Sequence, residues 1–425
     1  MVLAKLGILF LLIILLIRLK VPFSLTILLA AVALGFWFHL GLKDIAISAL
    51  KTIQDKETLS LAGIIASILI LSELLQSAGL LDQLSKSIIE LFGLYRFTYT
   101  IIPALIGLLP MPGGALFSAP IMDGVSNDII PAHKKTLINY WFRHIWEYAW
   151  FLYPGFMLAA QLANVNPKSL SALQSPFILI CIVAGLIILF SGIKIEKQPA
   201  DRKKWSPVKV LRLAYLLSPI ALIIILFMLG LPMLLCMAIS LVWVILNTML
   251  RRQIKPLTVV KIIFAKKHIY QMIFIVATVL IFTGVLKTSS ATGDLLTFFN
   301  GGLPAGPEGA SQVPFAYIMI SAIVLPFITG MLTGMTTAFV GITFPLIFAV
   351  VGPTGGNPLP WAMLAYVSGL SGVMLSPLHL CLVLTTKYYG TTLSKVYRYL
   401  IPLVAVVFIS GIIIFSAIMV FYPNN

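Results

Sequence analysis

Long apolar runs separated by short polar segments are the dominant pattern in this chain of 425 residues. A helix rises about 1.5 Å per residue, so roughly 20 consecutive apolar residues cross the hydrocarbon core of a bilayer. The runs that approach this length predict simple membrane-spanning helices at 2–18, 21–41, 58–78, 175–193, 212–229, 231–250, 268–288 and 398–421. Shorter amphipathic segments are expected to lie along the membrane interface, at 44–55, 80–93, 256–267 and 292–300.

Helix-breaking or small polar residues interrupt four further apolar stretches, which are 97–124, 136–165, 314–350 and 359–390. The first and third carry PMPGG at 110–114 and TGMTT at 333–337, and we expect both to be re-entrant hairpins with these segments at their tips. The second and fourth break near 153–155 and 371–379, and we expect them to be broken helices that cross the membrane.

The order of these segments occurs twice along the chain, which predicts an internal repeat. Five residues of the first half match five of the second at one constant offset: Pro103, Gly107, Leu109, Ala115 and Pro154 with Pro326, Gly330, Leu332, Ala338 and Pro377. The first repeat would cover 1–195, a linker 196–211 and the second repeat 212–425. With hairpins that return and broken helices that cross, each repeat crosses an odd number of times, so the repeats are inverted. The predicted fold is an all-α polytopic membrane protein with about ten transmembrane helices plus two re-entrant hairpins.

Composition agrees with a membrane protein. Hydrophobic residues make up 60% of the chain and charged residues only 10%, which excludes a soluble enzyme. The net charge of +16 would suggest a nucleic-acid partner in a soluble protein, but here the positive-inside rule explains it and no nucleic acid is expected. The basic segments 194–212 and 251–267 are therefore placed in the cytoplasm and both termini outside, in the plasma membrane of a bacterium or archaeon.

The four interruptions predict a ligand site because unpaired backbone groups inside a membrane are costly unless they line a cavity. Helix ends there would offer N–H groups to anions and carbonyl groups to cations, and threonine hydroxyls would suit Na⁺ or carboxylate oxygens. The candidate substrate- or ion-binding residues are Pro112, Gly113, Gly114, Ser118, Thr333, Gly334, Thr336, Thr337, Ser371, Ser376, Pro377 and His379.

Two charged residues lie inside the first broken helix. Arg143 and Glu147 are four residues apart, so they share a helix face and can form a structural ion pair. The functional alternative is that Arg143 binds a substrate carboxylate and Glu147 carries a proton. The three cysteines, Cys181, Cys236 and Cys381, lie in separate apolar runs and are interpreted as small core residues without a disulfide.

The interrupted segments resemble the ion transporter superfamily of secondary carriers. PALIGLLPMPGGALFSAPIMD (103–123) and PFITGMLTGMTTAFVGITFPLI (326–347) are similar to its two hairpins, and SGLSGVMLSPLHLCL (368–382) is similar to its second broken helix. Dicarboxylate carriers of that superfamily have Ser-Asn-Thr at both tips. Here the tips read Met111-Pro112-Gly113 and Gly334-Met335-Thr336, so the first tip has lost its side-chain ligands.

This resemblance implies a homodimeric carrier with a scaffold and a moving transport domain. It would move a small organic anion, such as a carboxylate, by an elevator motion coupled to Na⁺ or H⁺. No cofactor is expected apart from Na⁺ as a coupling ion, and the other partners are the anionic solute and the lipid bilayer.

Two other functions remain open from the sequence. Gly369-Leu370-Ser371-Gly372 matches the GxSG pattern of intramembrane serine proteases, and His379 follows at a distance that only the helix break could close. A channel-like permease would also explain irregular backbone at paired positions.

Overall fold

The computed structural model describes residues 2–92, 96–111, 113–126, 130–193, 206–299, 313–354 and 356–421. Within these ranges the regular structure is entirely helical, as the apolar pattern predicts. The first half contains α1 (Val2–Arg18), α2 (Phe23–Trp37), α3 (Leu42–Gln54), α4 (Lys56–Ser77), α5 (Leu80–Phe92), α6 (Arg96–Gly107), α7 (Ala115–Ser126), α8 (Ala132–His144), the 3₁₀ turn η1 (Ile145–Tyr148), α9 (Pro154–Leu162) and α10 (Pro167–Phe190).

The second half follows the same order of elements. It contains α11 (Pro207–Met228), α12 (Met233–Leu250), α13 (Pro256–Ala265), α14 (Lys267–Thr288), α15 (Ala291–Phe299), α16 (Phe315–Thr333), α17 (Thr336–Val351), η2 (Gly352–Thr354), α18 (Pro358–Leu375), α19 (Leu380–Tyr388) and α20 (Leu393–Phe421). Each of the four interrupted stretches forms two helices, so the expected breaks are present.

Eight helical segments of the described chain are long and apolar enough to cross a membrane. They are α4, α10, α11, α12, α13 together with α14, α16, α18 together with α19, and α20. The run expected at 2–18 forms α1 with the same bounds and 17 residues, whereas the run expected at 21–41 forms a shorter helix of 15 residues, because Pro22 precedes α2 and α2 ends at Trp37. The first arm of the second expected hairpin, α16, has 19 residues and meets the length of a span on its own.

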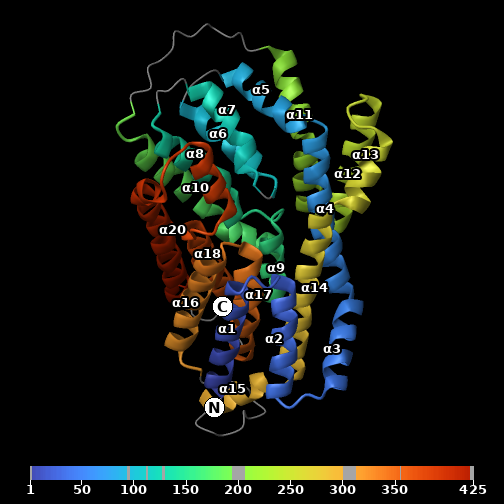
Figure 1. The fold of residues 1–425 in the computed structure, drawn as a ribbon, viewed down its shortest axis with the longest axis vertical. Coiled ribbons are helices and arrows are strands. Elements are labelled where there is room, and N and C mark those ends of the chain that lie inside the picture. The colour runs from blue at the N-terminus through green and yellow to red at the C-terminus, as the bar shows by residue number, and fades with distance from the viewer. Residues whose placement is uncertain are drawn as a thin grey trace.

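The helices pack in two groups. The outer group is defined here as α2–α5 and α11–α14, where α14 packs against α2, α3 and α4, and α12 packs against α4. The inner group is α6–α10 and α16–α20, which contains all four interrupted stretches (Figure 1). Figure 1 places α1, α3 and α15 at the end of the molecule that carries the N-terminus and α5, α7 and α13 toward the opposite end.

Inside the inner group, corresponding helices make corresponding contacts. The first arm of each interrupted pair packs on the helix that begins the next broken helix, α6 on α8 and α16 on α18. The second elements are exchanged between the halves, because α7 packs against α19 and α9 packs against α17. The two halves therefore meet along the breaks themselves.

Two matched glycines allow the backbones of the packed helices to approach closely. A Cβ atom on Gly107 would collide with the carbonyl oxygen of Arg143, and one on Gly330 would collide with the carbonyl oxygen of Gly369. Gly372 approaches the Phe327 carbonyl in the same way. Helix backbones can come this close only where small residues remove the side chain between them, as is common in membrane helix pairs.

Candidate functional site

The two broken helices stop and restart at adjacent points in the interior. The first runs from α8 through η1 and an irregular turn to α9, which begins at Pro154, a residue suited to the first helical position. The second ends α18 at Leu375 and begins α19 at Leu380 after Ser376-Pro377. α8 packs against α19, so polar residues near both breaks share one buried region.

Arg143, on the last turn of α8, lies beneath the first hairpin tip. Its side chain is only 2% exposed, and Nη2 donates to the Met111 carbonyl at 2.9 Å. Gly114 provides the room, since a Cβ there would collide with the guanidinium. Among the described residues, Nε of Arg143 has no hydrogen-bond partner. A buried guanidinium with an unused donor is a costly arrangement that a bound anion would relieve.

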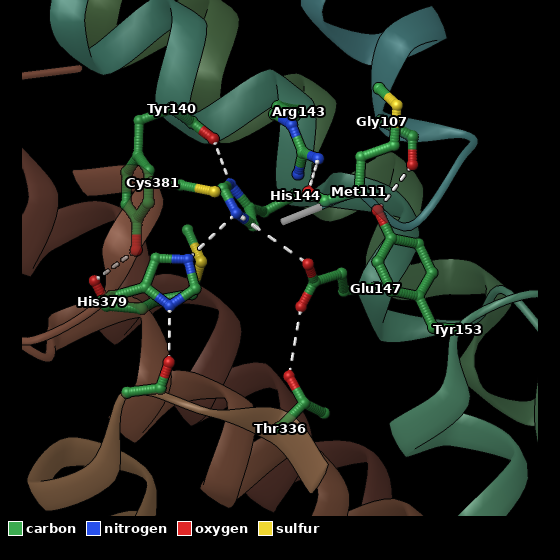
Figure 2. Close-up of polar contacts among 12 residues, drawn as sticks. Gly107, Met111, Tyr140, Arg143, His144, Glu147, Tyr153, Thr336, His379 and Cys381 are labelled. Carbon is green, nitrogen blue, oxygen red and sulfur yellow. Dashed lines mark hydrogen bonds and ion pairs between the residues drawn. The ribbon is translucent and has the colours of Figure 1, made fainter. Parts of the chain in front are cut away.

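Glu147 connects the first break to the second hairpin tip. Its carboxylate oxygen Oε2 accepts a hydrogen bond from Thr336 Oγ1 at 3.3 Å, and Oε1 lies 3.8 Å from His144 Nε2 (Figure 2). Thr336 is the first residue of α17, directly after Gly334 and Met335 break the helix. Arg143 lies on the last turn of α8 and Glu147 on η1, so they do not share the continuous helix face that the sequence predicts, and each contacts other groups.

Two histidines, one from each half of the chain, meet in the centre of Figure 2. His144 Nε2 and His379 Nε2 are 3.1 Å apart. The other nitrogen of each ring faces a backbone carbonyl: Nδ1 of His144 lies 2.5 Å from the Tyr140 oxygen, and Nδ1 of His379 lies 2.9 Å from the Gly334 oxygen. Gly334 has a φ of 66°, a left-handed conformation that turns its carbonyl out of α16 toward the histidine.

Two tyrosine hydroxyls tie the breaks to neighbouring backbone. Tyr140 donates to the Met374 carbonyl at 3.0 Å, and Tyr153 donates to the Gly107 carbonyl at 2.6 Å. The Tyr140 ring also packs against both histidines, with ring centroids 4.6 Å from His144 and 5.5 Å from His379. These contacts hold the end of α18 and the end of α6 at the same buried centre.

The structure brings together part of the predicted site. Gly114, Arg143, Glu147, Gly334, Thr336 and His379 are linked by the contacts described above. Gly113 has a φ of 68° and lies at the same tip, against Leu384 of α19, whereas Pro112 lies outside the described residues.

Other predicted residues serve their own helices. The hydroxyls of Ser118, Thr333 and Ser371 donate to carbonyls three or four residues back. Ser376 Oγ accepts from the Leu378 N–H in the break, Pro377 is exposed, and Thr337 is buried on α17.

His144, Tyr140 and Cys381 are not among the binding residues predicted from the sequence, although His144 is one of the ionisable groups in the first broken helix. His144 and Tyr140 precede Glu147 at helical spacing, a signal that could have placed them on one face. Cys381 was interpreted as a core residue, but its Sγ lies within 4.8 Å of ring nitrogens of His144 and His379. Its position two residues after His379, at the start of α19, could have indicated this.

The geometry does not favour the protease alternative. Ser371 is fully buried, and its hydroxyl donates to the Val367 carbonyl at 2.7 Å. Both ring nitrogens of His379 face other atoms, the Gly334 carbonyl and His144. A serine nucleophile requires a base within hydrogen-bond reach, and His379 is not oriented to serve as one.

Comparison with known proteins places this fold. No curated protein is found to match the sequence. A solved structure that resembles the chain is that of the YdaH transporter from Alcanivorax borkumensis, which is described as having an unusual topology. The two structures superpose with a TM-score of 0.68, and the match covers 95% of this chain and 98% of that one at 16% sequence identity. At this identity the likeness establishes a shared fold. A family model described as "Protein of unknown function (DUF401)" matches residues 2–418, and the chain therefore belongs to the DUF401 family.

Proposed function

We propose that this protein is a secondary active transporter that carries a small organic anion, a carboxylate, across the plasma membrane. Its fold resembles that of a protein described as a transporter. Broken helices with polar groups at their ends are typical of secondary carriers, in which helix ends bind the substrate near the middle of the membrane.

The observation that carries the proposal is the buried guanidinium of Arg143 under the glycine tip. An arginine in the interior of a membrane protein is costly and pairs with another group or lines a substrate path. Arg143 uses one donor on the Met111 carbonyl and leaves Nε unpartnered among the described residues. A carboxylate accepts two parallel N–H bonds from one guanidinium, so it supplies both the missing acceptor and the counter-charge.

The histidine pair supports the proposal of proton coupling. Each Nδ1 faces a carbonyl, which can only accept a hydrogen bond, so both Nδ1 atoms carry the hydrogen and both Nε2 atoms present lone pairs to each other. One additional proton between them makes the contact attractive, and Oε1 of Glu147 lies 3.8 Å from His144 Nε2. The proton raises the charge of the site by one, which favours entry of an anion beside Arg143.

The two helical groups suit an elevator motion, in which the inner group moves relative to the outer one. The groups touch through α14 with α17, through α5 with α6 and through α4 with α9. A homodimer formed through the outer group would keep it fixed in the membrane. Na⁺ remains the other coupling ion, and a channel-like permease remains the other mode of transport.

The test is uptake by purified protein in liposomes, using a panel of radiolabelled organic acids. We expect accumulation of at least one acid under an inward pH gradient, without a requirement for Na⁺. Counterflow from preloaded liposomes should occur, because a carrier exchanges its substrate and a channel does not.

A matched pair of variants locates the site. Arg143→Gln should reduce uptake at least about a hundredfold, because removing a hydrogen-bonded charge costs roughly 3 kcal/mol or more. Arg398→Gln, which changes an exposed arginine of α20, should leave uptake unchanged. Equal uptake by both variants, or no uptake of any organic acid, would contradict the proposal.

A further inference from the structure

Three side-chain atoms of types that bind transition-metal ions, two imidazole nitrogens and one thiol sulfur, lie together where the two halves of the chain meet. One ring nitrogen of His144, one of His379 and Sγ of Cys381 all lie within 4.8 Å of one another. His144 is 1% exposed, Cys381 6% and His379 9%, so the group is closed off from bulk water. His144 ends α8, whereas the other two residues lie at the start of α19.

The tautomers leave these atoms free to bind a metal ion. Nδ1 of each histidine faces a backbone carbonyl and must carry the hydrogen, so each Nε2 has a lone pair. The two lone pairs lie 3.1 Å apart, and a cation between them would make this contact attractive. Histidine ligands of metal ions commonly donate their second N–H to a backbone carbonyl, which is the arrangement at Tyr140 and Gly334.

The spacing matches a tetrahedral zinc centre. Zn–N bonds of about 2.0–2.1 Å at a tetrahedral angle put two ligand nitrogens roughly 3.3 Å apart. The two Nε2 atoms here are 3.1 Å apart, so a zinc ion displaced to one side of the line between them would need only a small adjustment of the rings. A thiolate is the third ligand that favours Zn²⁺ over Na⁺, Mg²⁺ or Ca²⁺.

We propose that His144, His379 and Cys381 form a site for one Zn²⁺ ion per chain, with Glu147 as the fourth ligand. Oε1 of Glu147 lies 3.8 Å from His144 Nε2 but outside the group of ligand atoms that are within 4.8 Å of one another, so its side chain would move closer to complete the coordination. On binding, the thiol of Cys381 forms a Zn–S bond and releases its proton to water, as does any proton held between the histidines. The charges of thiolate and carboxylate then balance Zn²⁺, which suits a buried site.

This site does not depend on the transport of an organic anion. The metal ion would replace the coupling proton between the histidines, and it would fasten α8 to the break before α19. Zinc binding to purified protein can therefore succeed or fail independently of uptake.

The experiment uses the full-length protein in detergent, with any affinity tag removed and metal stripped by a chelator. Zn²⁺ alone is titrated in competition with a chelating dye, and Co²⁺ is used as a spectroscopic substitute. We expect one equivalent of Zn²⁺ per chain, a rise in the unfolding temperature, and a near-ultraviolet thiolate-to-cobalt absorption.

The matched control is another buried cysteine. Cys381→Ser should weaken Zn²⁺ binding at least about a hundredfold and abolish the cobalt absorption, because loss of a ligand costs at least as much as loss of an outer partner. Cys181→Ser, which changes a fully buried cysteine of α10, should leave both unchanged. His144→Asn and His379→Asn provide a second test that does not touch the thiol, and both should also lose the metal.

Three results would overturn the proposal. One is the lack of stoichiometric Zn²⁺ binding by the wild-type protein. Another is equal binding by Cys381→Ser and Cys181→Ser, and the third is a cobalt absorption that survives Cys381→Ser. Retention of binding with a roughly tenfold weaker affinity in Glu147→Gln would support the carboxylate as the fourth ligand.

Discussion

The two interrupted modules of the inner group, α6–α9 and α16–α19, have matching backbones and different chemistry. In both, a glycine of the first arm meets the carbonyl of the following broken helix, Gly107 at Arg143 and Gly330 at Gly369. The first module contributes the charges of Arg143 and Glu147. The second contributes neutral groups, the Thr336 hydroxyl and the Gly334 carbonyl.

This difference shows that the matched features are those that shape the helices, and that the site itself is asymmetric. The first tip carries no hydroxyl at the matching place, but its Gly114 makes room for a guanidinium that the second module lacks. A substrate between the modules would contact the charged side chains of Arg143 and Glu147 on one side and the Thr336 hydroxyl on the other.

The largest effects are expected where the backbones match. Gly107→Val and Gly330→Val should each destabilise the protein by about 3 kcal/mol or more, because the new side chain meets a backbone carbonyl that cannot rotate away. Thermal unfolding in detergent measures this, with Gly7→Ala as a control because a Cβ there meets no atom within 4 Å. A large loss of stability in only one of the two variants would show that the two modules do not pack in equivalent ways.

The next effect concerns the asymmetry of the tips. Gly114→Leu should abolish uptake while the protein stays folded, because the side chain would occupy the space of the Arg143 guanidinium. Uptake in liposomes and elution as a single species in size-exclusion chromatography measure the two outcomes. Gly293→Leu on α15 is the control, since its Cβ would enter open space; normal uptake by Gly114→Leu would refute this placement of the site.

Removing the negative charge of the first module should affect coupling more than exchange. Glu147→Gln should lower pH-driven accumulation at least about tenfold, because it removes an intramembrane carboxylate beside the histidine pair, and proton relays in transporters are built from such groups. Accumulation is compared with substrate exchange at equal pH, and Glu90→Gln on α5 is the control. If the variant still accumulates substrate in response to the gradient, Glu147 has no part in coupling.

A smaller effect is expected at the second tip. Thr336→Val removes the hydrogen bond to Glu147 and should reduce uptake about tenfold, since hydrogen bonds to charged groups contribute roughly 1.5–3 kcal/mol. Thr333→Val, three residues earlier, removes a bond to the Thr329 carbonyl and a long contact from the Met335 N–H at 3.4 Å, neither of which involves a charged group, so it should change uptake little. The reverse order of the two effects would assign the ligand role to Thr333 instead.

The smallest effect is expected at Ser371. Ser371→Ala removes a hydroxyl that donates to the Val367 carbonyl of its own helix, so stability should change by about 0.5 kcal/mol or less and uptake should be normal. Thermal unfolding and the liposome assay check this. Loss of a peptide-cleaving activity in this variant would instead revive the protease alternative.

The sequence predicted the helices and their breaks well because both depend on local features. Apolar length identified α4, α10, α11, α12, α14 and α20 as spans, although α1 and α2 fall short of span length, and Pro154, Ser376-Pro377 and Gly334 marked the interruptions where the structure has them. It also singled out Arg143, Glu147 and His379, since charged or titratable groups in apolar runs stand out. The inverted relation of the repeats and the dimer remain predictions.

What only the tertiary structure decided is which polar groups meet. His144 and His379 are far apart in the chain, and their ring contact depends on how α8 packs against α19. The same packing moved Cys381 from an expected core position to the centre of the site and gave Arg143 the Met111 carbonyl as a partner. Hydrophobic length and helix breakers act over a few residues, whereas a ligand site depends on long-range packing that no local pattern specifies.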